Sequence, residues 1–318
     1  MIRSTRLALA AGTLLVLAGC ATEPAVEESA ADPAAASNVQ LLEDVRILSA
    51  DDMEGRDTGA AGGERARAYI VSRLEAMGVA PAPFGRLQPF EAAGRTHEGP
   101  KTFHGTNIVS LIPGTRVPDR YIVVTAHYDH VGVNGGQIYN GADDNASGVA
   151  TMLELARRLK AKAPEHSVLI VALDGEERGL LGAREFVKAP PTPLTSMSVN
   201  INYDMTARAE TDGHLWVTGT YQNPALRPIL DQVAANGAVS LAFGKDTPAD
   251  TEENNWVDAS DHAAFHDAGV PFLYFGVDYH PDYHRPSDDF ERITPSVFTS
   301  ATELAIDAFH ALDRSLDR

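Results

Sequence analysis

The sequence has almost no cysteine, since Cys20 is the only one among its 318 residues. An intramolecular disulfide needs two cysteines, and a structural zinc site built on cysteine needs more, so both are excluded. The chain also lacks an apolar run long enough for a mature membrane-spanning helix, because the longest candidate, residues 7–18, is too short to cross a bilayer. Disulfide scaffolds and integral membrane proteins are therefore set aside.

Positive charge is scarce as well. The chain carries 26 Lys and Arg residues against 44 Asp and Glu residues, which gives a formal net charge of -18. Such a surface repels nucleic acid and anionic membranes, and it leaves carboxylates free to bind cations. We therefore expect no nucleic-acid partner. The hydrophobic content of 44% is ordinary for a globular protein, so the body of the chain is expected to fold around a core.

The first residues have the features of a targeting segment. Two arginines precede the apolar run of residues 7–18, as in a secretory signal peptide. The stretch Leu17–Cys20 resembles a bacterial lipobox, in which the cysteine becomes the lipidated first residue. We expect residues 1–19 to be removed and the exported protein to be anchored through Cys20. The expected location is the outer membrane, facing the periplasm, or the cell surface, and the lipid is the only membrane contact expected.

Residues 20–37 are rich in Ala, Glu and Pro and have almost no large apolar side chain. Such a segment cannot bury enough apolar surface to fold, so it is predicted to be a disordered tether. Residues 38–318 then form one predicted domain, because no internal repeat or further linker divides them.

The centre of this domain reads as strand, helix and strand. Apolar runs at 121–126 and 167–173 flank a stretch with helical spacing at about 146–162. A connection of this length predicts a right-handed parallel crossover. The fold class predicted is α/β, a single domain with a mixed, mainly parallel sheet between helices. Further helices are predicted near 39–48, 66–78, 179–188, 223–236, 261–268 and 295–312, further strands at 107–112, 198–203, 215–219 and 270–277, and irregular or edge-strand structure at 80–106.

Candidate metal ligands follow the predicted strands. In an open α/β sheet, sites form beyond the carboxyl ends of the strands, so side chains that follow different strands can meet there. Two histidines and several carboxylates occupy such positions, and this mixed set suits zinc, and also cobalt or manganese. These residues are His127, Asp143, Asp144, Glu176, Glu177, Asp204 and His284.

As a set, the motifs resemble those of the co-catalytic two-zinc aminopeptidases of metallopeptidase family twenty-eight. The resemblance covers about residues 40–312 and implies a zinc exopeptidase fold, which is phosphorylase/hydrolase-like, with two Zn²⁺ ions per chain and peptide substrates. The matching stretches are Ala126–Asp129, Gly141–Gly148, Glu176–Gly179, Asn202–Met205, Ser260–His262 and Tyr283–Asp288.

The same resemblance implies a role for each ligand. Asp143 would bridge the two zinc ions and join Asp144 through a cis peptide bond. His127 and Asp204 would complete the first zinc site. Glu177 and His284 would complete the second. Glu176 would be the general base that takes a proton from the zinc-activated water and gives it to the leaving amine.

Two of these assignments have a physical argument of their own. In a Glu-Glu pair at a strand end, neighbouring side chains point in different directions, so one can bind a metal while the other faces the water, and the resemblance makes Glu177 the ligand and Glu176 the base. Asp129 lies two residues after His127 and returns to the same side, where it can accept the other imidazole N–H and orient the ring. Asp129 therefore joins Glu176 among the predicted catalytic residues.

Other histidines compete for the same role. His130, His262, His266 and His280 are alternative ligands, but only His284 is followed by Pro and Asp at the spacing of the family. A serine hydrolase triad in Ser260–His262 is disfavoured, because adjacent side chains point apart and the chain has no Gly-x-Ser-x-Gly motif.

The predicted function is that of an exported exopeptidase that removes N-terminal residues from peptides. Three alternatives stay open. The chain could be a carboxypeptidase or dipeptidase, it could resemble the related one-zinc glutaminyl cyclases, or it could be a lipoprotein that binds without catalysis.

Overall fold

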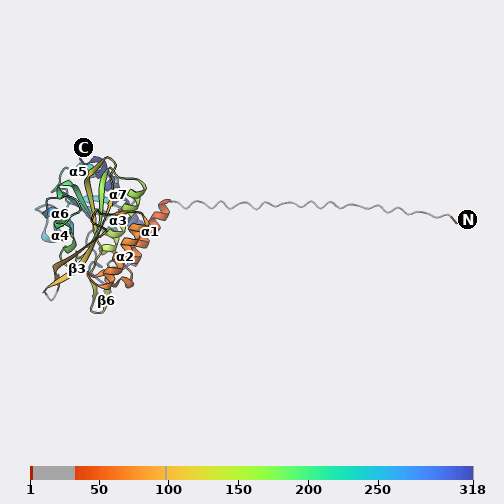
Figure 1. Cartoon of the computed structure of the whole chain (residues 1–318), viewed down its shortest axis with the longest axis horizontal. Coiled ribbons are helices and arrows are strands. Elements are labelled where there is room, and N and C mark those ends of the chain that lie inside the picture. The colour runs from red at the N-terminus through yellow and green to blue at the C-terminus, as the bar shows by residue number, and fades with distance from the viewer. Residues whose placement is uncertain (3–32, 97–98, 318) are drawn as a thin grey trace.

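The structure is a computed structural model that describes residues 1–2, 33–96 and 99–317. The predicted lipobox with Cys20 and the predicted tether up to residue 32 lie outside the described residues. Among the helices that are described, none is both long enough and apolar enough to cross a membrane. The helices and strands of the body pack around one central sheet (Figure 1).

Nine strands form this sheet, in the order β1-β3-β7-β4-β8-β11-β9-β10, with β2 paired to β3 at one side. Strand β4 is parallel to β7 and β8, and β8 is parallel to β11, whereas β3 and β9 join these strands in antiparallel pairs. The prediction of a mixed, mainly parallel sheet is confirmed. The strands are β1 (Ala80–Pro81), β2 (Leu87–Thr96), β3 (Gly99–Ile112), β4 (Val117–His127), β7 (His166–Leu173), β8 (Met197–Tyr203), β9 (His214–Thr218), β10 (Ser240–Phe243) and β11 (Phe272–Gly276).

Helices cover both faces of the sheet, because the central strands are apolar on both sides. In β7 the side chains of Val168, Ile170 and Ala172 enter one core, and those of Leu169, Val171 and Leu173 enter the other. All eight residues of this strand are buried, which is typical of a strand in a parallel sheet. The sheet is thus the middle layer of three.

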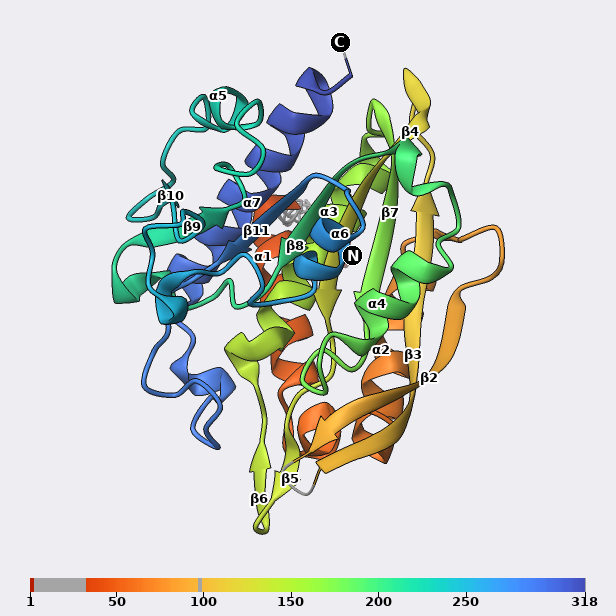
Figure 2. The same ribbon diagram turned by 90° about the vertical axis from the view of Figure 1, so that its left-hand side faces the viewer.

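Figure 2 shows the two helical layers. Helices α1, α3 and α7 lie behind the sheet, and α4 and α6 lie in front of it. The hairpin of β5 (Gly132–Asn134) and β6 (Gln137–Tyr139) projects at the lower end. The helices are α1 (Pro33–Leu48), α2 (Ala61–Ala76), α3 (Gly148–Ala161), α4 (Leu181–Lys188), α5 (Arg227–Leu230), α6 (His262–Asp267) and α7 (Pro295–Ser315).

The predicted strand-helix-strand unit is formed by β4, α3 and β7. The two strands pair in parallel from Tyr121 opposite Ser167 to His127 opposite Leu173. Helix α3 packs between them and the neighbouring helices through the apolar side chains that the helical spacing picked out, such as Val149, Met152 and Leu159. This unit places His127 at the end of its first strand.

Two predictions about elements are wrong, and one open alternative is decided. For residues 80–106, predicted to be irregular or edge-strand structure, β2 is an edge strand that pairs with β3 at ten positions. The predicted helix 223–236 is only α5, since few of its side chains are buried and the chain turns at Gly237, whose φ is +59°. Helix α1 begins at Pro33, inside the predicted tether, where a proline suits the first turn of a helix.

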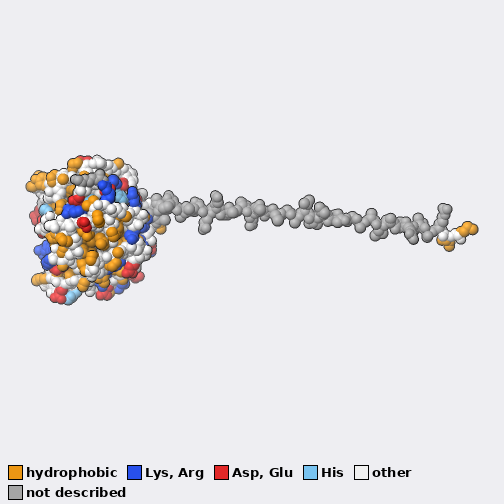
Figure 3. Space-filling view, turned by 45° about the horizontal axis from the view of Figure 1, so that its top comes forward, with side chains coloured by type: hydrophobic (Ala, Val, Ile, Leu, Met, Phe, Trp, Pro, Cys, Tyr) orange, Lys and Arg blue, Asp and Glu red, His pale blue; other side chains and the backbone are white. Residues whose placement is uncertain are grey.

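One face of the body is shown in Figure 3. Basic and acidic side chains are interspersed there with apolar ones, so charge of one sign does not dominate this face. Part of the negative charge of the chain is buried at the ends of the parallel strands described next.

Candidate metal centre

The carboxyl ends of β4, β7 and β8 bring most of the predicted ligands together. His127 is the last residue of β4, Glu176 and Glu177 lie in the turn after β7, and Asp204 follows β8. Parallel neighbours end at the same edge of a sheet, so residues that are distant in the sequence meet there. Two more segments complete the site, namely the loop before α3 and the loop that carries His284.

A first cluster is formed by His127, Asp144 and Asp204, and all three residues are buried. The Nε2 atom of His127 lies 3.3 Å from Oδ1 of Asp204 and 3.4 Å from Oδ1 of Asp144. Ligand atoms about 2.0–2.1 Å from a tetrahedral zinc ion are roughly 3.3 Å from each other. The spacing within this cluster therefore fits one such ion.

A second cluster shares Asp144 with the first. Its members are His130, Asp144 and Glu177, each with one ligand atom within 4.8 Å of the others. His284 reaches the same carboxylates, since its Nε2 atom lies 3.0 Å from Oδ2 of Asp144 and 3.4 Å from Oε1 of Glu177. One oxygen of Asp144 thus faces each cluster, which is the arrangement of a bridging ligand.

Buried polar atoms without partners support a cation at this second cluster. The Oε1 atom of Glu177 and both ring nitrogens of His130 are buried and have no hydrogen-bond partner among the described residues. Nδ1 of His130 lies 2.7 Å from Oε1 of Glu177, but the two atoms are not aligned for a hydrogen bond. Buried polar groups are nearly always satisfied, so the residues present fit a bound metal ion.

The structure does not place Asp143 as the resemblance implied. Its Oδ2 atom lies 3.0 Å from Nε2 of His280, and its Oδ1 atom accepts hydrogen bonds from the backbone N–H of Ala207 and the hydroxyl of Ser147. The carboxylate of Asp143 is therefore engaged away from the two clusters. Asp144 occupies the position predicted for the bridge, so the bridging prediction is corrected by one residue.

The cis peptide bond is shifted in the same way, since it joins Asp144 to Asn145 instead of Asp143 to Asp144. Asp144 has irregular backbone angles, with φ -103° and ψ 93°, and these turn its side chain toward the clusters. The loop begins at Gly141, whose φ is +56° and where a Cβ atom would stand 2.0 Å from the carbonyl oxygen of Asp144. Only glycine fits this position.

Asp288 holds the loop from its other side. Its carboxylate accepts hydrogen bonds from the backbone N–H groups of Asp143 and Asp144, each at 3.1 Å. Burial and the nearby charge of Asp143 raise the pKa of Asp288 to about 6. This residue belongs to the Tyr283–Asp288 motif, and it connects the loop of His284 to the loop of Asp144.

Asp129 differs from its predicted role in one respect. Nδ1 of His127 lies 3.1 Å from the backbone carbonyl oxygen of Asp129 and 3.7 Å from its carboxylate, so the nearer acceptor is the carbonyl. The carboxylate instead accepts hydrogen bonds from the backbone N–H groups of Glu176, at 3.0 Å, and Glu177, at 3.2 Å. Asp129 therefore orients both the imidazole and the turn that carries the two glutamates.

Glu176 faces a small cavity of 30 Å³ that His127, Asp144 and Asp204 also line. Burial and the negative charges of Glu177, Asp261 and Asp204 raise the pKa of Glu176 well above its usual range, although His127 opposes them. A carboxyl group with a raised pKa is suited to accept and return a proton near neutral pH.

Glu177 and His284 have pKa values that are shifted in opposite directions. Burial disfavours the charged form of Glu177, but the adjacent His130 and His284 hold its pKa well below the usual range. Burial also disfavours the imidazolium of His284, but its contacts with Asp144 and Glu177 raise its pKa to about 11.

The competing histidines occupy different places. His130 lies inside the second cluster, but its contacts of 2.7 and 3.7 Å match the tetrahedral spacing less well than the 3.0 and 3.4 Å of His284. His280 contacts Asp143, and His266 lies against the ring of Phe272. His284 stays a predicted ligand, and His130 lies in the same cluster.

The Ser260–His262 stretch does not form a triad. The hydroxyl of Ser260 accepts a hydrogen bond from the amide of Asn202, and Nε2 of His262 lies 2.8 Å from the carbonyl oxygen of Trp256. Burial lowers the pKa of His262 to about 4. Among the described residues no hydrogen bond joins His262 to the hydroxyl of Ser260, so the pair lacks the contact that a triad requires.

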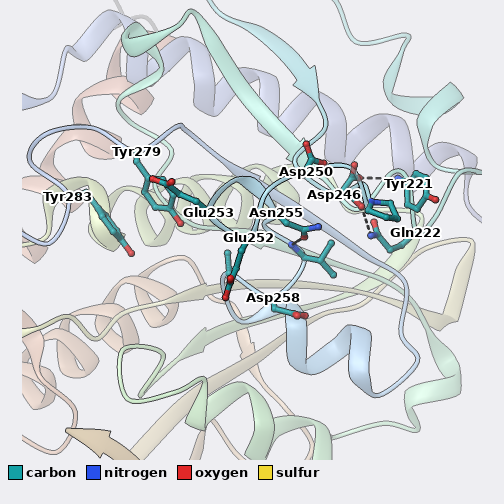
Figure 4. A pocket seen from close by; sticks show the side chains of 13 residues that line it. Tyr221, Gln222, Asp246, Asp250, Glu252, Glu253, Asn255, Asp258, Tyr279 and Tyr283 are labelled. Carbon is teal, nitrogen blue, oxygen red and sulfur yellow. Dashed lines mark hydrogen bonds between the residues drawn. The ribbon is translucent and has the colours of Figure 1, made fainter. Parts of the chain in front are cut away.

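A larger cleft of 1030 Å³ adjoins the small cavity, and both are lined by Ala259, Tyr279 and Tyr283. Figure 4 shows carboxylates along this cleft, and its lining residues include no Lys or Arg. Glu252, Glu253 and Asp258 are exposed there. The negative charge of this region favours a cationic group in the cleft.

The sequence was compared with known proteins. The model described as "Peptidase family M28" matches residues 107–309. The protein "Aminopeptidase YwaD" of Bacillus subtilis (strain 168) is 30% identical over 202 residues, which cover 59% of this chain and 40% of the relative. The matched part therefore spans less than half of the length of that relative.

Solved structures share the fold. A zinc aminopeptidase from Bacillus subtilis aligns with a TM-score of 0.67 at 18% identity, covering 88% of this chain and 95% of the other. A glutaminyl cyclase of Fimbriiglobus ruber also aligns with a TM-score of 0.67, at 20% identity, covering 86% and 95%. At these identities the likeness concerns the architecture and not the reaction.

Proposed function

Because the chain belongs to peptidase family M28, we propose that it is a metal-dependent exopeptidase that hydrolyses N-terminal residues from peptides. The observation that carries the proposal is the position of Asp144, which faces His127 and Asp204 with one oxygen and the cluster of Glu177 and His284 with the other. A shared carboxylate between two ligand sets is the arrangement needed for two neighbouring ions.

Zinc suits this donor set, which combines imidazole nitrogens with carboxylate oxygens. His127 and Asp204 would hold one ion, and Glu177 and His284 would hold the other. Asp144 would contribute one oxygen to each ion. Zinc bound there would supply a Lewis acid that polarises the peptide carbonyl and lowers the pKa of water.

The other steps belong to side chains of this chain. Glu176 accepts the proton of the attacking water and delivers it to the leaving amine, because its buried carboxyl group has a raised pKa and lines the cavity beside both clusters. Asp129 fixes the backbone of Glu176 and Glu177 and so maintains the distance between the base and the clusters. The aromatic side chains of Tyr279 and Tyr283 separate this cavity from the open cleft.

The acidic cleft suits a substrate that has a free amino terminus. An α-ammonium group is attracted to a cavity lined by carboxylates and by no basic side chain. A peptide whose amine is acetylated loses this attraction. The proposal therefore predicts that aminoacyl anilides are cleaved and that their N-acetylated forms are not.

Zinc content and turnover test the proposal together. The full chain should bind close to two zinc ions, and Glu176→Gln should keep both ions while its kcat falls by roughly 10³-fold, because the substitution removes only the proton acceptor. An enzyme that cleaved only the acetylated substrates would contradict the aminopeptidase assignment. Full activity of the Glu176→Gln variant would remove Glu176 from the mechanism.

Glutaminyl cyclisation is the second candidate, and the fold shared with the Fimbriiglobus ruber enzyme favours it. Incubation of peptides with an N-terminal glutamine separates the two reactions by product mass, because cyclisation releases ammonia and hydrolysis releases the free amino acid. Binding of a single zinc ion together with loss of ammonia would replace the exopeptidase assignment.

A further inference from the structure

Arg56 is buried completely, and its guanidinium donates only to backbone carbonyl groups. Nε donates to Tyr128 at 2.8 Å, Nη1 to Leu48 at 2.6 Å and Asn140 at 2.5 Å, and Nη2 to Gly141 at 2.9 Å and Asp144 at 3.4 Å. A guanidinium has five N–H donors, so each of them has an acceptor. A cation used in this way supports the backbone and does not form a simple ion pair.

Four of the five acceptors belong to the ligand-bearing loops. Tyr128 directly follows His127, and Asn140, Gly141 and Asp144 form the loop that presents the shared carboxylate. On the opposite side of this loop, Asp288 accepts the N–H groups of Asp143 and Asp144. The loop is therefore held between a buried cation on its carbonyls and a buried anion on its amides.

The next two residues contact the turn after β7 and the end of the His127–Asp129 stretch. Asp57 accepts a hydrogen bond from Nε of Arg178, which follows Glu177, at 3.1 Å. Thr58 donates its hydroxyl to Oδ2 of Asp129 at 3.2 Å, and the same carboxylate holds the N–H groups of the Glu176–Glu177 turn. The segment Arg56–Thr58 thus contacts three separate segments that carry candidate ligands or the base.

The backbone of this segment can adopt its position only with a glycine. Glu54, Gly55 and Arg56 have φ values of 47°, 63° and 55°, a left-handed run that costs free energy for residues with a side chain. A Cβ atom at Gly55 would stand 2.4 Å from the carbonyl oxygen of Tyr139. Unfavourable backbone conformations of this kind are kept where the surrounding structure requires them, as at functional sites.

Charge supports the same interpretation. Burial lowers the pKa of Arg56 to about 10, and the charges of Asp144, Asp288, Asp129 and Glu177 oppose this decrease. The guanidinium therefore remains a cation at neutral pH behind a group of carboxylates. It offsets part of their mutual repulsion without using any of the oxygens that face the clusters.

We propose that the segment Arg56–Thr58 positions the metal centre, with Arg56 holding the loop of Asp144 and the residue after His127, and Thr58 holding Asp129, in the geometry that two ions require. The segment lies before residue 107, where the family match begins. The inference rests on the proposed function for its effect on turnover, whereas its effect on metal binding can be measured without a substrate.

The test compares Arg56→Lys with a matched control in the full chain. Lysine keeps the charge but has three donors on one atom, so it cannot reach all five carbonyls. The control is Arg86→Lys, because Arg86 is a partly buried arginine that donates to Ser110 and Val79, outside the contacts of the site. Zinc affinity is measured by competition with a chromogenic chelator, and kcat and KM with an aminoacyl anilide.

We expect Arg56→Lys to weaken zinc binding by roughly 10–100-fold, as for other residues that support metal ligands. Its kcat should fall at least tenfold with KM nearly unchanged, because the substrate cleft is intact. Arg86→Lys should stay within about twofold of the unaltered protein in every quantity. A folded Arg56→Lys protein with unaltered zinc affinity would overturn the proposal, even if its thermal stability were reduced.

A second variant decides the question if Arg56→Lys does not fold. Thr58→Val keeps the shape of the side chain and removes only the hydroxyl that donates to Asp129. It should weaken zinc binding by several fold, and unaltered affinity would overturn the proposal. Failure of the unaltered protein to cleave any tested peptide would refute the proposed function, while the zinc affinities of the variants would still test the role of the segment.

Discussion

At the scale of single residues, the site depends on which of two adjacent carboxylates faces the clusters. Asp143 and Asp144 are chemically alike, and both are buried. Asp143 is bound by Ala207, Ser147 and His280, whereas Asp144 lies between the imidazoles of His127 and His284. The two residues should therefore respond differently to the same substitution.

Replacement of each aspartate by asparagine tests this difference. Asp144→Asn should reduce zinc binding and kcat/KM by more than about 100-fold, because it removes charge from a ligand and not only from a residue that supports one. Asp143→Asn should retain both ions and lose stability instead, by about 1–3 kcal/mol, since a buried hydrogen-bond acceptor is altered. Zinc content and urea unfolding measure the two effects. The opposite pattern would restore Asp143 as the bridge.

At the scale of elements, helix α7 is fixed to the start of β7 by Asp313. Its carboxylate accepts hydrogen bonds from the backbone N–H groups of Glu165 and His166, each at 2.9 Å, and lies 3.0 Å from Nδ1 of His166. Burial opposes the charged form of both partners, yet their contact raises the pKa of His166 and lowers that of Asp313. The pair joins the last helix to a central strand.

This pair predicts a pH-dependent loss of stability for Asp313→Asn. Because the pKa of His166 is raised in the folded protein, the protonated side chain stabilises the fold. This contribution is fully present below about pH 6.5, the pKa in the unfolded chain, and is lost as the pH rises through the pKa in the folded protein. Because the pKa of Asp313 is lowered in the folded protein, the ionised carboxylate stabilises the fold above about pH 4, the pKa in the unfolded chain. This contribution is lost as the pH falls through the pKa in the folded protein. The substitution should therefore cost most near pH 5–6, about 1–3 kcal/mol, and less at pH 9.

Urea unfolding at pH 5.5 and pH 9 measures this difference. Asp231→Asn is the control, because its ion pair with Arg227 is exposed and is expected to contribute less than about 1 kcal/mol. Equal losses for Asp313→Asn at both pH values would show that only its backbone hydrogen bonds matter.

Predictions about elements were best where hydrophobic periodicity was strong. The strands β4 and β7 and the helices α3 and α7 were predicted within a few residues of their bounds, because each has a continuous apolar face or run. The β2–β3 hairpin was predicted only in part, as edge-strand structure, since the residue types of β2 lack a regular alternation of apolar and polar side chains although their exposure alternates in the fold. Its strands are recognisable only through their pairing.

At the scale of the whole molecule, the fold gathers buried carboxylates at one edge of its sheet. Asp144, Glu177 and Asp204 lie together there, and the buried cation Arg56 interacts with the charges of Asp144 and Glu177. Like charges in a buried place repel each other, and bound cations remove this repulsion. The metal is therefore expected to stabilise the protein as well as to enable its reaction.

Removal of the metal should lower the melting temperature, and zinc should restore it. Free zinc at 100 times its Kd adds about 2.7 kcal/mol of stability to a protein with one such site. The effect should be larger at pH 8 than at pH 6, because the pKa of His284 is raised to about 11 and its proton must leave before it binds a metal.

Thermal unfolding of the chelator-treated protein, with and without zinc, measures this effect. The Asp144→Asn variant serves as the control and should show little increase. An unaltered melting temperature of the natural sequence at both pH values would contradict a metal centre built from these residues.

The sequence by itself determined the order of the central elements and the edge of the sheet at which the site lies. Apolar runs of strand length define β4 and β7, an alternating stretch defines β8, and the charged candidate ligands stand where these strands end. Parallel pairing then brings the ends together. For this reason His127, Glu177 and Asp204 could be named without coordinates.

Only the tertiary structure decided which side chains in the irregular loops face the clusters. The direction of Asp144 depends on the backbone angles of a loop that is held by Arg56 on one side and Asp288 on the other, and these residues are 88 and 144 positions away in the sequence. Hydrophobic periodicity carries no information about such contacts. Loop geometry is set by distant hydrogen bonds, and these form only when the chain has folded.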